Sequence, residues 1–155
     1  MDLIVNVCEN WGIGFQGKLL VSISADLRRF RQLTQGRTVI LGRKTLATFP
    51  GGRPLKNRTN LILSGSGCTV EGAEVFPDLP SLLIRLRDLD LEQVSVIGGE
   101  SVYRALLPYC SRAYVTRTLL SPAADAFFPD LDRLDTWRLE REGEGLEENG
   151  LRFRY

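Results

Sequence analysis

The sequence predicts an α/β fold with a doubly wound, mostly parallel central sheet and antiparallel strands towards the C-terminus. The first observation is a set of short, nearly continuous apolar runs, at residues 3–7, 38–41, 60–63 and 94–97. Such runs are typical of central strands that are covered on both faces. The second observation is a set of helical patterns between these runs, at residues 25–34, 44–49, 79–89 and 100–107. Strands that alternate with helices favour a parallel sheet.

The C-terminal third of the chain has a different pattern. Strands are predicted at residues 113–119, 137–141 and 151–155, with no convincing helix between them. An antiparallel edge on an otherwise parallel sheet would account for this change. We expect residues 1–155 to form a single domain, because a chain of 155 residues can bury a sizeable core without disulfides or a metal.

The overall composition argues against several classes of function. The formal net charge is +1, which gives no general attraction to nucleic acid or to an anionic membrane. No apolar run approaches the roughly 18 residues of a membrane span. Three cysteines stand far apart without a CxxC pair, which favours a reducing compartment over a zinc site. We therefore expect a cytoplasmic protein, a monomer by default, with neither nucleic acid nor a membrane as a partner.

The chain contains no histidine. This absence excludes Ser-His-Asp and Cys-His nucleophile systems and histidine-ligated zinc, and we expect no metal site. Acid–base chemistry would have to use a carboxylate, tyrosine, lysine, cysteine or water.

Two loops are long for a compact domain, which is typical of lids and binding loops. Residues 8–22 contain Gly12, Gly14 and Gly17 among apolar side chains. Residues 50–58 carry three cations among turn-forming residues, although an ordinary solvated turn would explain this second loop as well.

Asp26 occupies an unusual position in the first predicted helix. It falls at helical spacing with Ile23, Leu27 and Phe30, so it shares the apolar face. An ionised carboxylate in apolar surroundings costs several kcal/mol unless a partner compensates. One interpretation is that Ser24 is the N-cap and Asp26 complements the helix dipole. The other is that Asp26 has a functional partner.

Three predicted strands end in segments suited to phosphate, at residues 41–45, 63–66 and 97–101. Ligands of open α/β sheets bind beyond the carboxyl ends of strands, with phosphates at helix N-termini. Arg43 and Lys44 oppose the dipole of the helix that they begin, unless they serve an anion there. Together with Ser64 they would favour NADP over NAD by meeting a 2′-phosphate. The G-x-G-x-x-G fingerprint of Rossmann dinucleotide-binding proteins is missing, but a dinucleotide could still bind through the three strand ends together.

Seven motifs in order make the chain similar to the dihydrofolate reductase family over essentially its whole length. They are GIG at 12–14, ADLRRF at 25–30, LGRKT at 41–45, RPL at 53–55 with Arg58, VIGGESVY at 96–103, YVT at 114–116 and FPD at 128–130. The resemblance implies an NADPH-dependent oxidoreductase that converts 7,8-dihydrofolate to 5,6,7,8-tetrahydrofolate in one-carbon metabolism and is a target of antifolate inhibitors. It also implies hydride transfer from nicotinamide C4 to pterin C6, with water-mediated protonation of N5.

The resemblance further implies roles for individual residues. The expected catalytic residues are Asp26, which binds N3 and the 2-amino group of the pterin, and Thr116, which supports that contact. The expected substrate-binding residues are Ile4, Asn6, Leu27, Phe30, Phe49, Arg58, Ile97 and Tyr103, with Arg58 as the clamp on the glutamate α-carboxylate. The expected NADPH-binding residues are Asn6, Ile13, Gly14, Lys18, Gly42, Arg43, Lys44, Thr45, Ser64, Gly98, Gly99, Ser101, Val102 and Asp125.

Two positions depart from the family's pattern. Many bacterial members have Pro-Trp where this chain has Leu20-Val21, and Val21 cannot donate the hydrogen bond that helps to order the active-site water. Many members carry a proline at the helix start, where this chain has Ser24. Two other functions stay open: a related pterin or pyrimidine reductase, and a nucleotide-binding protein without turnover. Asp26 and Arg58 favour folate as the substrate.

Overall fold

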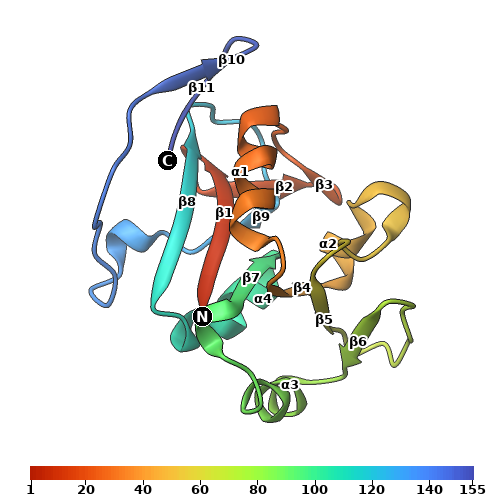
Figure 1. Ribbon diagram of the computed structural model, residues 1–155. Helices are drawn as coiled ribbons and strands as arrows, with labels where there is room; N and C mark the ends of the chain where they lie inside the picture. The colour runs from red at the N-terminus through yellow and green to blue at the C-terminus, as the bar shows by residue number, and fades with distance from the viewer.

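Eight strands form one mixed sheet in the computed structural model, which describes residues 1–155 (Figure 1). From edge to edge the order is β10 (Leu146–Glu148), β11 (Leu151–Arg154), β8 (Arg112–Thr118), β1 (Asp2–Cys8), β7 (Val94–Gly98), β4 (Thr38–Gly42), β5 (Thr59–Leu63) and β6 (Ala73–Phe76). The strands from β8 to β6 pair in parallel, whereas β11 pairs antiparallel with both β8 and β10. The predicted fold class is confirmed.

Helices and apolar side chains cover both faces of this sheet. The helices are α1 (Ser24–Thr34), α2 (Arg43–Ala47), α3 (Leu79–Leu86) and α4 (Glu100–Leu106). Successive residues of a strand point to opposite faces, so Ile40 joins the core beneath α3 and α4 while Leu41 joins a second core. Leu46 of α2 belongs to that second core, and Phe30 of α1 packs against it. This arrangement is the doubly wound one that the sequence predicts.

The predicted helices are all present, with ends that differ by up to a few residues. Short 3-10 turns follow or connect several elements, namely η1 (Pro50–Gly52), η2 (Leu91–Gln93), η3 (Leu107–Tyr109) and η4 (Leu131–Arg133). None of the helices has the length and apolar character needed to cross a bilayer.

The long loop after β1 is more regular than expected. It forms β2 (Gly12–Phe15) and β3 (Lys18–Leu19), which join β9 (Ala126–Phe127) in a separate three-stranded sheet. Gln16 and Gly17 make the turn between β2 and β3 with positive φ values of 50° and 79°. The expected loop is therefore a small hairpin with its own partner strand.

The strand predicted at residues 137–141 is wrong, and the segment is irregular. Trp137 packs against the larger core, whereas Leu139 is 72% exposed. β10 occupies the place beside β11, so residues 137–141 do not pair with that strand. β6 and β10 were not predicted at all, since β6 has only four residues and β10 has three with a single apolar side chain.

Candidate active site

Asp26 lies half-buried in the first turn of α1, where two side chains from the sheet hold its carboxylate. Asn6 donates to one carboxylate oxygen at 3.0 Å, and Thr116 donates to the other at 2.6 Å. These two residues lie opposite each other in the parallel pair β1 and β8. The register of that pair therefore brings one donor to each oxygen.

A second hydrogen bond fixes the orientation of the Asn6 amide. Thr118 donates from its hydroxyl to Oδ1 of Asn6 at 2.8 Å, which leaves the Asn6 NH₂ group free to face Asp26. Both threonines are buried. The first-turn position of Asp26 is confirmed, and the carboxylate is also tied to two strands of the sheet.

The expectation that Ser24 is the N-cap of this helix is wrong. Ile23 occupies the N-cap position and makes no side-chain cap. The carboxylate of Glu148, on β10, instead accepts hydrogen bonds from the backbone N–H groups of Ser24 at 2.7 Å and Ala25 at 3.3 Å. The acceptor comes from the far end of the chain, where no local pattern could indicate it.

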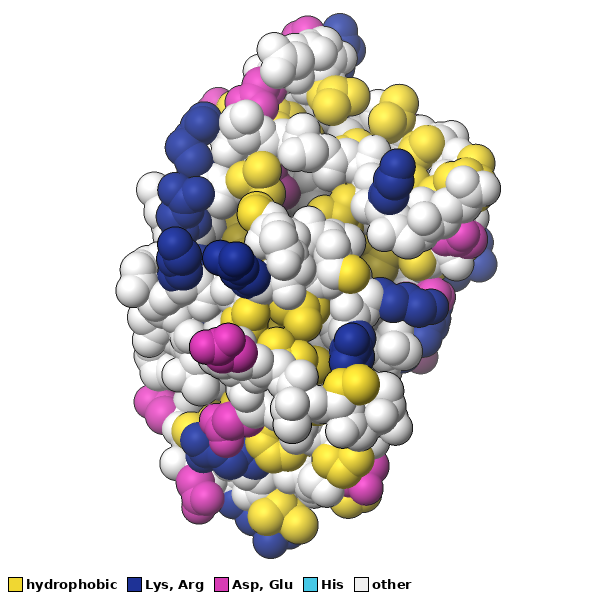
Figure 2. Space-filling view, turned by 90° about the vertical axis from the view of Figure 1, so that its right-hand side faces the viewer, with side chains coloured by type: hydrophobic (Ala, Val, Ile, Leu, Met, Phe, Trp, Pro, Cys, Tyr) yellow, Lys and Arg dark blue, Asp and Glu magenta, His cyan; other side chains and the backbone are white.

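The apolar residues predicted to line the substrate pocket are largely brought together. Ile4 and Ile97 are buried, and Phe30 and Phe49 pack against the core that contains Ile97. Leu27 was expected on the buried face, but it is 50% exposed. Figure 2 shows hydrophobic side chains gathered in the hollowed middle of one face of the molecule.

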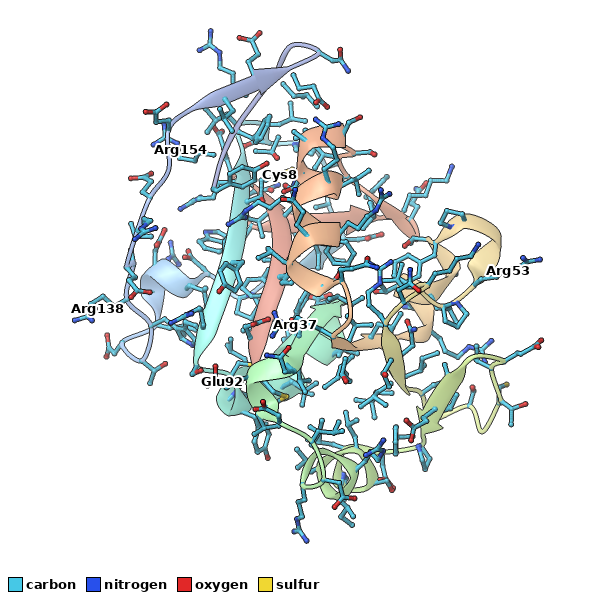
Figure 3. All side chains as sticks on the ribbon, viewed as in Figure 1. Cys8, Arg37, Arg53, Glu92, Arg138 and Arg154 are labelled. Carbon is cyan, nitrogen blue, oxygen red and sulfur yellow. The ribbon has the colours of Figure 1, made fainter.

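Arg58 is the only one of the three cations in the loop at residues 50–58 that is withdrawn from solvent. Arg53 points outward (Figure 3), whereas Arg58 is half-buried. The Arg58 guanidinium donates to Thr34 Oγ1 at 3.0 Å and to the Lys56 carbonyl at 2.9 Å. It forms no ion pair with an acidic side chain, and burial together with Arg31 lowers its pKa. An anionic ligand would compensate this charge.

The three strand ends predicted to bind a nucleotide lie side by side, because β7, β4 and β5 are neighbours in the sheet. Gly42 and Gly99 are the N-cap residues of α2 and α4, and neither helix has a side-chain cap. A Cβ atom on Gly98 would meet Thr45 Oγ1 at 3.1 Å, and one on Gly42 would meet Val102 Cγ2 at 3.1 Å. These glycines therefore allow close approach of strand ends and helices that bulkier residues would prevent.

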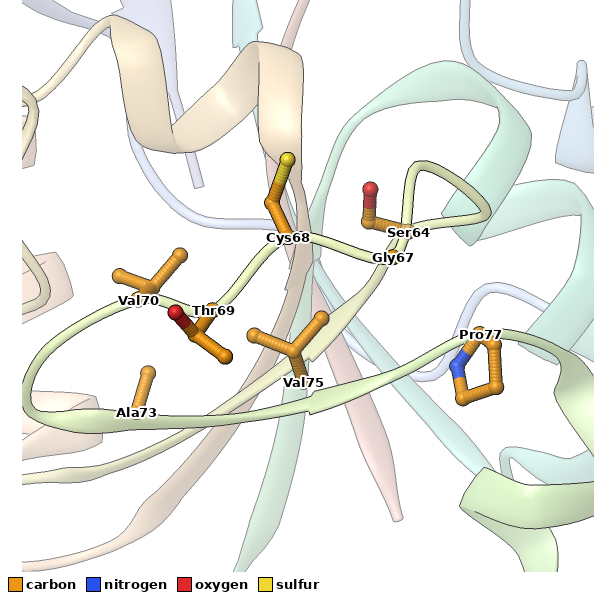
Figure 4. A pocket seen from close by; sticks show the side chains of 8 residues that line it. All are labelled: Ser64, Gly67, Cys68, Thr69, Val70, Ala73, Val75 and Pro77. Atoms are coloured by element: carbon orange, nitrogen blue, oxygen red, sulfur yellow. The ribbon is translucent and has the colours of Figure 1, made fainter.

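A cavity of about 300 Å³ lies beyond the end of β5. Its lining consists of Ser64, Gly67, Cys68, Thr69, Val70, Ala73, Val75 and Pro77 (Figure 4). The hydroxyl of Ser64 lies 2.9 Å from that of Ser66, and Ser66 together with nearby Arg43 lowers the pKa of the Cys68 thiol. The sequence predicts Ser64 and Arg43 as cofactor-binding residues, but no pattern in it indicates Cys68.

Four of the remaining residues predicted to bind NADPH lie in or beside the β2–β3 hairpin. Ile13 and Gly14 lie on β2 and Lys18 on β3. Asp125 accepts a hydrogen bond from the Gln16 N–H at 3.0 Å and donates its own N–H to the Gly14 carbonyl at 3.0 Å. Asp125 thus holds the β2–β3 hairpin in place, whatever else it contacts.

The start of α4 carries three more of these residues. Ser101 is exposed, whereas Val102 and Tyr103 are buried. The Tyr103 hydroxyl donates to the Ile4 carbonyl at 2.7 Å. It therefore links α4 to β1. Two further positions lie outside α4. Lys44 is exposed beside Arg43 at the start of α2. Val21, which stands where many bacterial members have tryptophan, is half-buried.

Comparison with known proteins agrees with this geometry. The whole chain, residues 1–155, matches the family described as dihydrofolate reductase. It is 40% identical over 148 residues to dihydrofolate reductase of Mycobacterium leprae, covering 92% of this chain and 87% of the relative. It is 32% identical over 173 residues to the Drosophila melanogaster enzyme of the same name, covering 99% and 94%. The Haemophilus influenzae enzyme is 36% identical over 139 residues, covering 90% and 84%. The chain belongs to the dihydrofolate reductase family.

Proposed function

We propose that NADPH is the nicotinamide cofactor with which this enzyme reduces 7,8-dihydrofolate to 5,6,7,8-tetrahydrofolate, and that Asp26 anchors the pterin ring. The observation that carries the proposal is the Asp26 carboxylate, with one donor on each oxygen. An ionised carboxylate offers about four acceptor positions, so about two remain free. Those positions match the paired donors of the pterin, N3–H and the 2-amino group.

Asp26 and its neighbours orient the substrate and keep bulk water from it. The carboxylate binds the pyrimidine edge of the pterin and has no direct reach to N5, so water delivers the proton to N5. Val21 has no hydrogen-bonding side chain with which to order that water. The apolar wall consists of Ile4, Leu27, Phe30, Phe49 and Ile97. Exclusion of water by this wall strengthens the charge interactions of Asp26.

The strand ends beside α2 and α4 fit a nicotinamide dinucleotide. When bound, NADPH supplies the hydride that reduces C6 of the pterin. The uncapped starts of both helices direct backbone N–H groups at phosphate oxygens. The Arg43 guanidinium and the Ser64 hydroxyl suit the 2′-phosphate, because a guanidinium matches phosphate geometry.

Arg58 suits the glutamate part of the substrate. It is half-buried, is oriented by Thr34 and has no acidic partner. A guanidinium binds a carboxylate through two parallel hydrogen bonds. We therefore assign the α-carboxylate of dihydrofolate to Arg58.

The other residue roles that the resemblance implies are also part of the proposal. They are substrate contacts by Asn6 and Tyr103 and cofactor contacts by Asn6, Ile13, Gly14, Lys18, Gly42, Lys44, Thr45, Gly98, Gly99, Ser101, Val102 and Asp125. We further propose one domain that acts as a cytoplasmic monomer without a nucleic-acid or membrane partner. The three cysteines are free, as expected in a reducing compartment.

The decisive experiment replaces Asp26 by asparagine, which keeps the shape but removes the charge. We expect turnover of dihydrofolate at neutral pH to fall by about 100-fold or more, while NADPH still binds with the affinity of the wild type. The exposed Asp135 provides a matched control, and Asp135→Asn is expected to leave both quantities unchanged. Retained turnover in Asp26→Asn would remove the anchor role. A wild-type chain that binds both ligands without oxidising NADPH would instead be a binding protein.

A further inference from the structure

The helix that carries Asp26 receives its N-terminal acceptor from a distant carboxylate. Glu148 accepts from the Ser24 N–H at 2.7 Å and from the Ala25 N–H at 3.3 Å. The first N–H groups of a helix have no partner within the helix, and Ile23 at the N-cap offers none. Glu148 therefore occupies the place that a local capping side chain would otherwise take.

The hairpin that carries Glu148 is itself anchored to the strand that holds Thr116. Glu148 pairs with Leu151 across the turn, and Phe153 of β11 pairs with Thr118 of β8. Phe153 is 2% exposed. Figure 1 shows the β10–β11 hairpin and the start of α1 at the same end of the molecule. The side chains that hold α1 and Asp26 thus come from one continuous part of the sheet.

A second contact between the same segments lies one turn further along the helix. The Arg29 guanidinium stacks over the ring of Tyr155 at 4.0 Å from the ring centroid, an arrangement that is attractive for a cation. Tyr155 also accepts the Gly143 N–H on its backbone carbonyl at 2.8 Å. The C-terminal segment therefore contacts both the first and the second turn of α1.

We propose that Glu148 is a positioning residue for the reduction of dihydrofolate. Its carboxylate fixes the backbone at Ser24 and Ala25, and Asp26 is the next residue in the chain. This contact holds the Asp26 carboxylate in register with Asn6 and Thr116, and so sets where the pterin binds. The inference rests on the proposed role of Asp26.

The nature of residue 24 makes this contact possible. Ser24 is the first residue of α1 and supplies the N–H in the shorter of the two hydrogen bonds. Proline is well accepted at the first helical position but has no N–H. The variant Ser24→Pro therefore removes that one donor while keeping the helix start.

The test measures kcat and KM for dihydrofolate, NADPH affinity and Tm in a set of variants. We expect Glu148→Ala to lower kcat/KM by on the order of 10-fold, with NADPH affinity unchanged. Glu148→Gln keeps one acceptor oxygen and is expected to lose less. The neighbouring Glu147 is exposed and makes no side-chain hydrogen bond, so Glu147→Ala serves as the matched control.

Two further variants separate positioning from plain stabilisation. Ser24→Pro is expected to lower kcat/KM in the wild type but to change nothing further in Glu148→Ala, because the acceptor is already gone. Glu148→Ala is likewise expected to have no added effect in Asp26→Asn. The positioning role would be overturned if Glu148→Ala lowered Tm but left kcat/KM, measured well below the unfolding transition, unchanged. It would also be overturned if the losses in kcat/KM of the single variants multiplied fully in the double variants. If Asp26→Asn itself stays active, the role of Asp26 fails; if only Glu148→Ala stays active, the role of Glu148 alone fails.

Discussion

The proposed substrate side and the proposed cofactor side of this enzyme are built in opposite ways. On the substrate side, the carboxylate of Asp26 already has Asn6 and Thr116 as hydrogen-bond partners. On the cofactor side, glycines bring strand ends and helix starts together, and the exposed cations Arg43 and Lys44 have no acidic partner. One side is a network of side chains, and the other is a backbone surface with unpaired charge.

This difference determines how each side responds to substitution. A buried polar network fails when one partner is lost, because the remaining group keeps its desolvation cost without its hydrogen bond. A backbone surface fails when a side chain is added or when a cation that pairs with the ligand is lost. Substitutions that add atoms or delete a cation should therefore damage the cofactor side, and those that delete a neutral hydrogen-bond donor should damage the substrate side.

The largest effect is expected from Gly98→Ala. The new Cβ would lie 3.1 Å from Thr45 Oγ1, and Gly98 has a φ of +128°, which side chains rarely adopt. Strain and overpacking together predict a loss of about 3 kcal/mol in the free energy of unfolding, with weaker NADPH binding. Denaturant titration and NADPH titration measure these effects. Gly36→Ala is the control, because Gly36 also has a positive φ of +72° but nothing within 4 Å. Equal losses in the two variants would contradict the close-approach argument.

The next effect is expected from Arg43→Gln, which deletes charge on the cofactor side. Loss of a hydrogen bond to a charged phosphate predicts about 2 kcal/mol weaker NADPH binding, roughly 30-fold, with NADH binding almost unchanged. Affinities for the two cofactors, measured in parallel, give this ratio. The exposed Arg87 is the control residue, and Arg87→Gln should leave the preference intact. A uniform loss for NADPH and NADH would place Arg43 away from the 2′-phosphate.

The two sides also differ in how far the sequence predicts them. The apolar runs and glycine-containing strand ends specify the central sheet and the cofactor edge, because the order of parallel strands brings those ends together. Asp26 is recognisable as an acid on an apolar helix face. The acceptor at the start of α1 is not predictable, since Glu148 lies 124 residues from Ser24 and only the tertiary fold joins them.

The elements that differ from the sequence prediction also depend on distant contacts. Residues 137–141 resemble a strand locally, but β10 takes the available place beside β11. The β2–β3 hairpin looks like a loop because its strands are short and it pairs with β9, more than 100 residues away. Short strands at sheet edges depend on which neighbour reaches them, and local pattern carries little of that information.

A smaller effect is expected on the substrate side from Thr116→Val, which keeps the shape and deletes the donor. The carboxylate oxygen that accepts at 2.6 Å would lose its partner, which predicts a cost of about 1.5 kcal/mol. This corresponds to a roughly 10-fold lower kcat/KM for dihydrofolate, with NADPH affinity retained. Steady-state kinetics with varied dihydrofolate measures it. Thr59→Val, on an exposed residue of β5, should have no such effect, and an unaltered kcat/KM in Thr116→Val would show that Asn6 alone holds Asp26.

The smallest effect concerns Tyr103, the residue that joins the two sides. Its hydroxyl donates to the Ile4 carbonyl at 2.7 Å, so Tyr103→Phe should cost about 1 kcal/mol of stability at neutral pH. Burial and the charge of Asp26 raise the Tyr103 pKa above its ordinary value of 10.0.

Below pH 10 the Tyr103 phenol keeps its proton in both the folded and the unfolded chain, so it adds no pH dependence there. Above that pH the unfolded chain releases the proton while the folded chain retains it, and the free energy of unfolding must fall as pH rises. Tyr103→Phe removes this contribution, so its stability should decline less steeply than that of the wild type in alkaline solution. Urea titrations across this range test the difference in slope, with Tyr109→Phe as the control on a phenol that is 49% exposed. If the free energy of unfolding fell equally steeply with pH in the wild type and in Tyr103→Phe, the Tyr103 phenol would not be buried as it is in the structure.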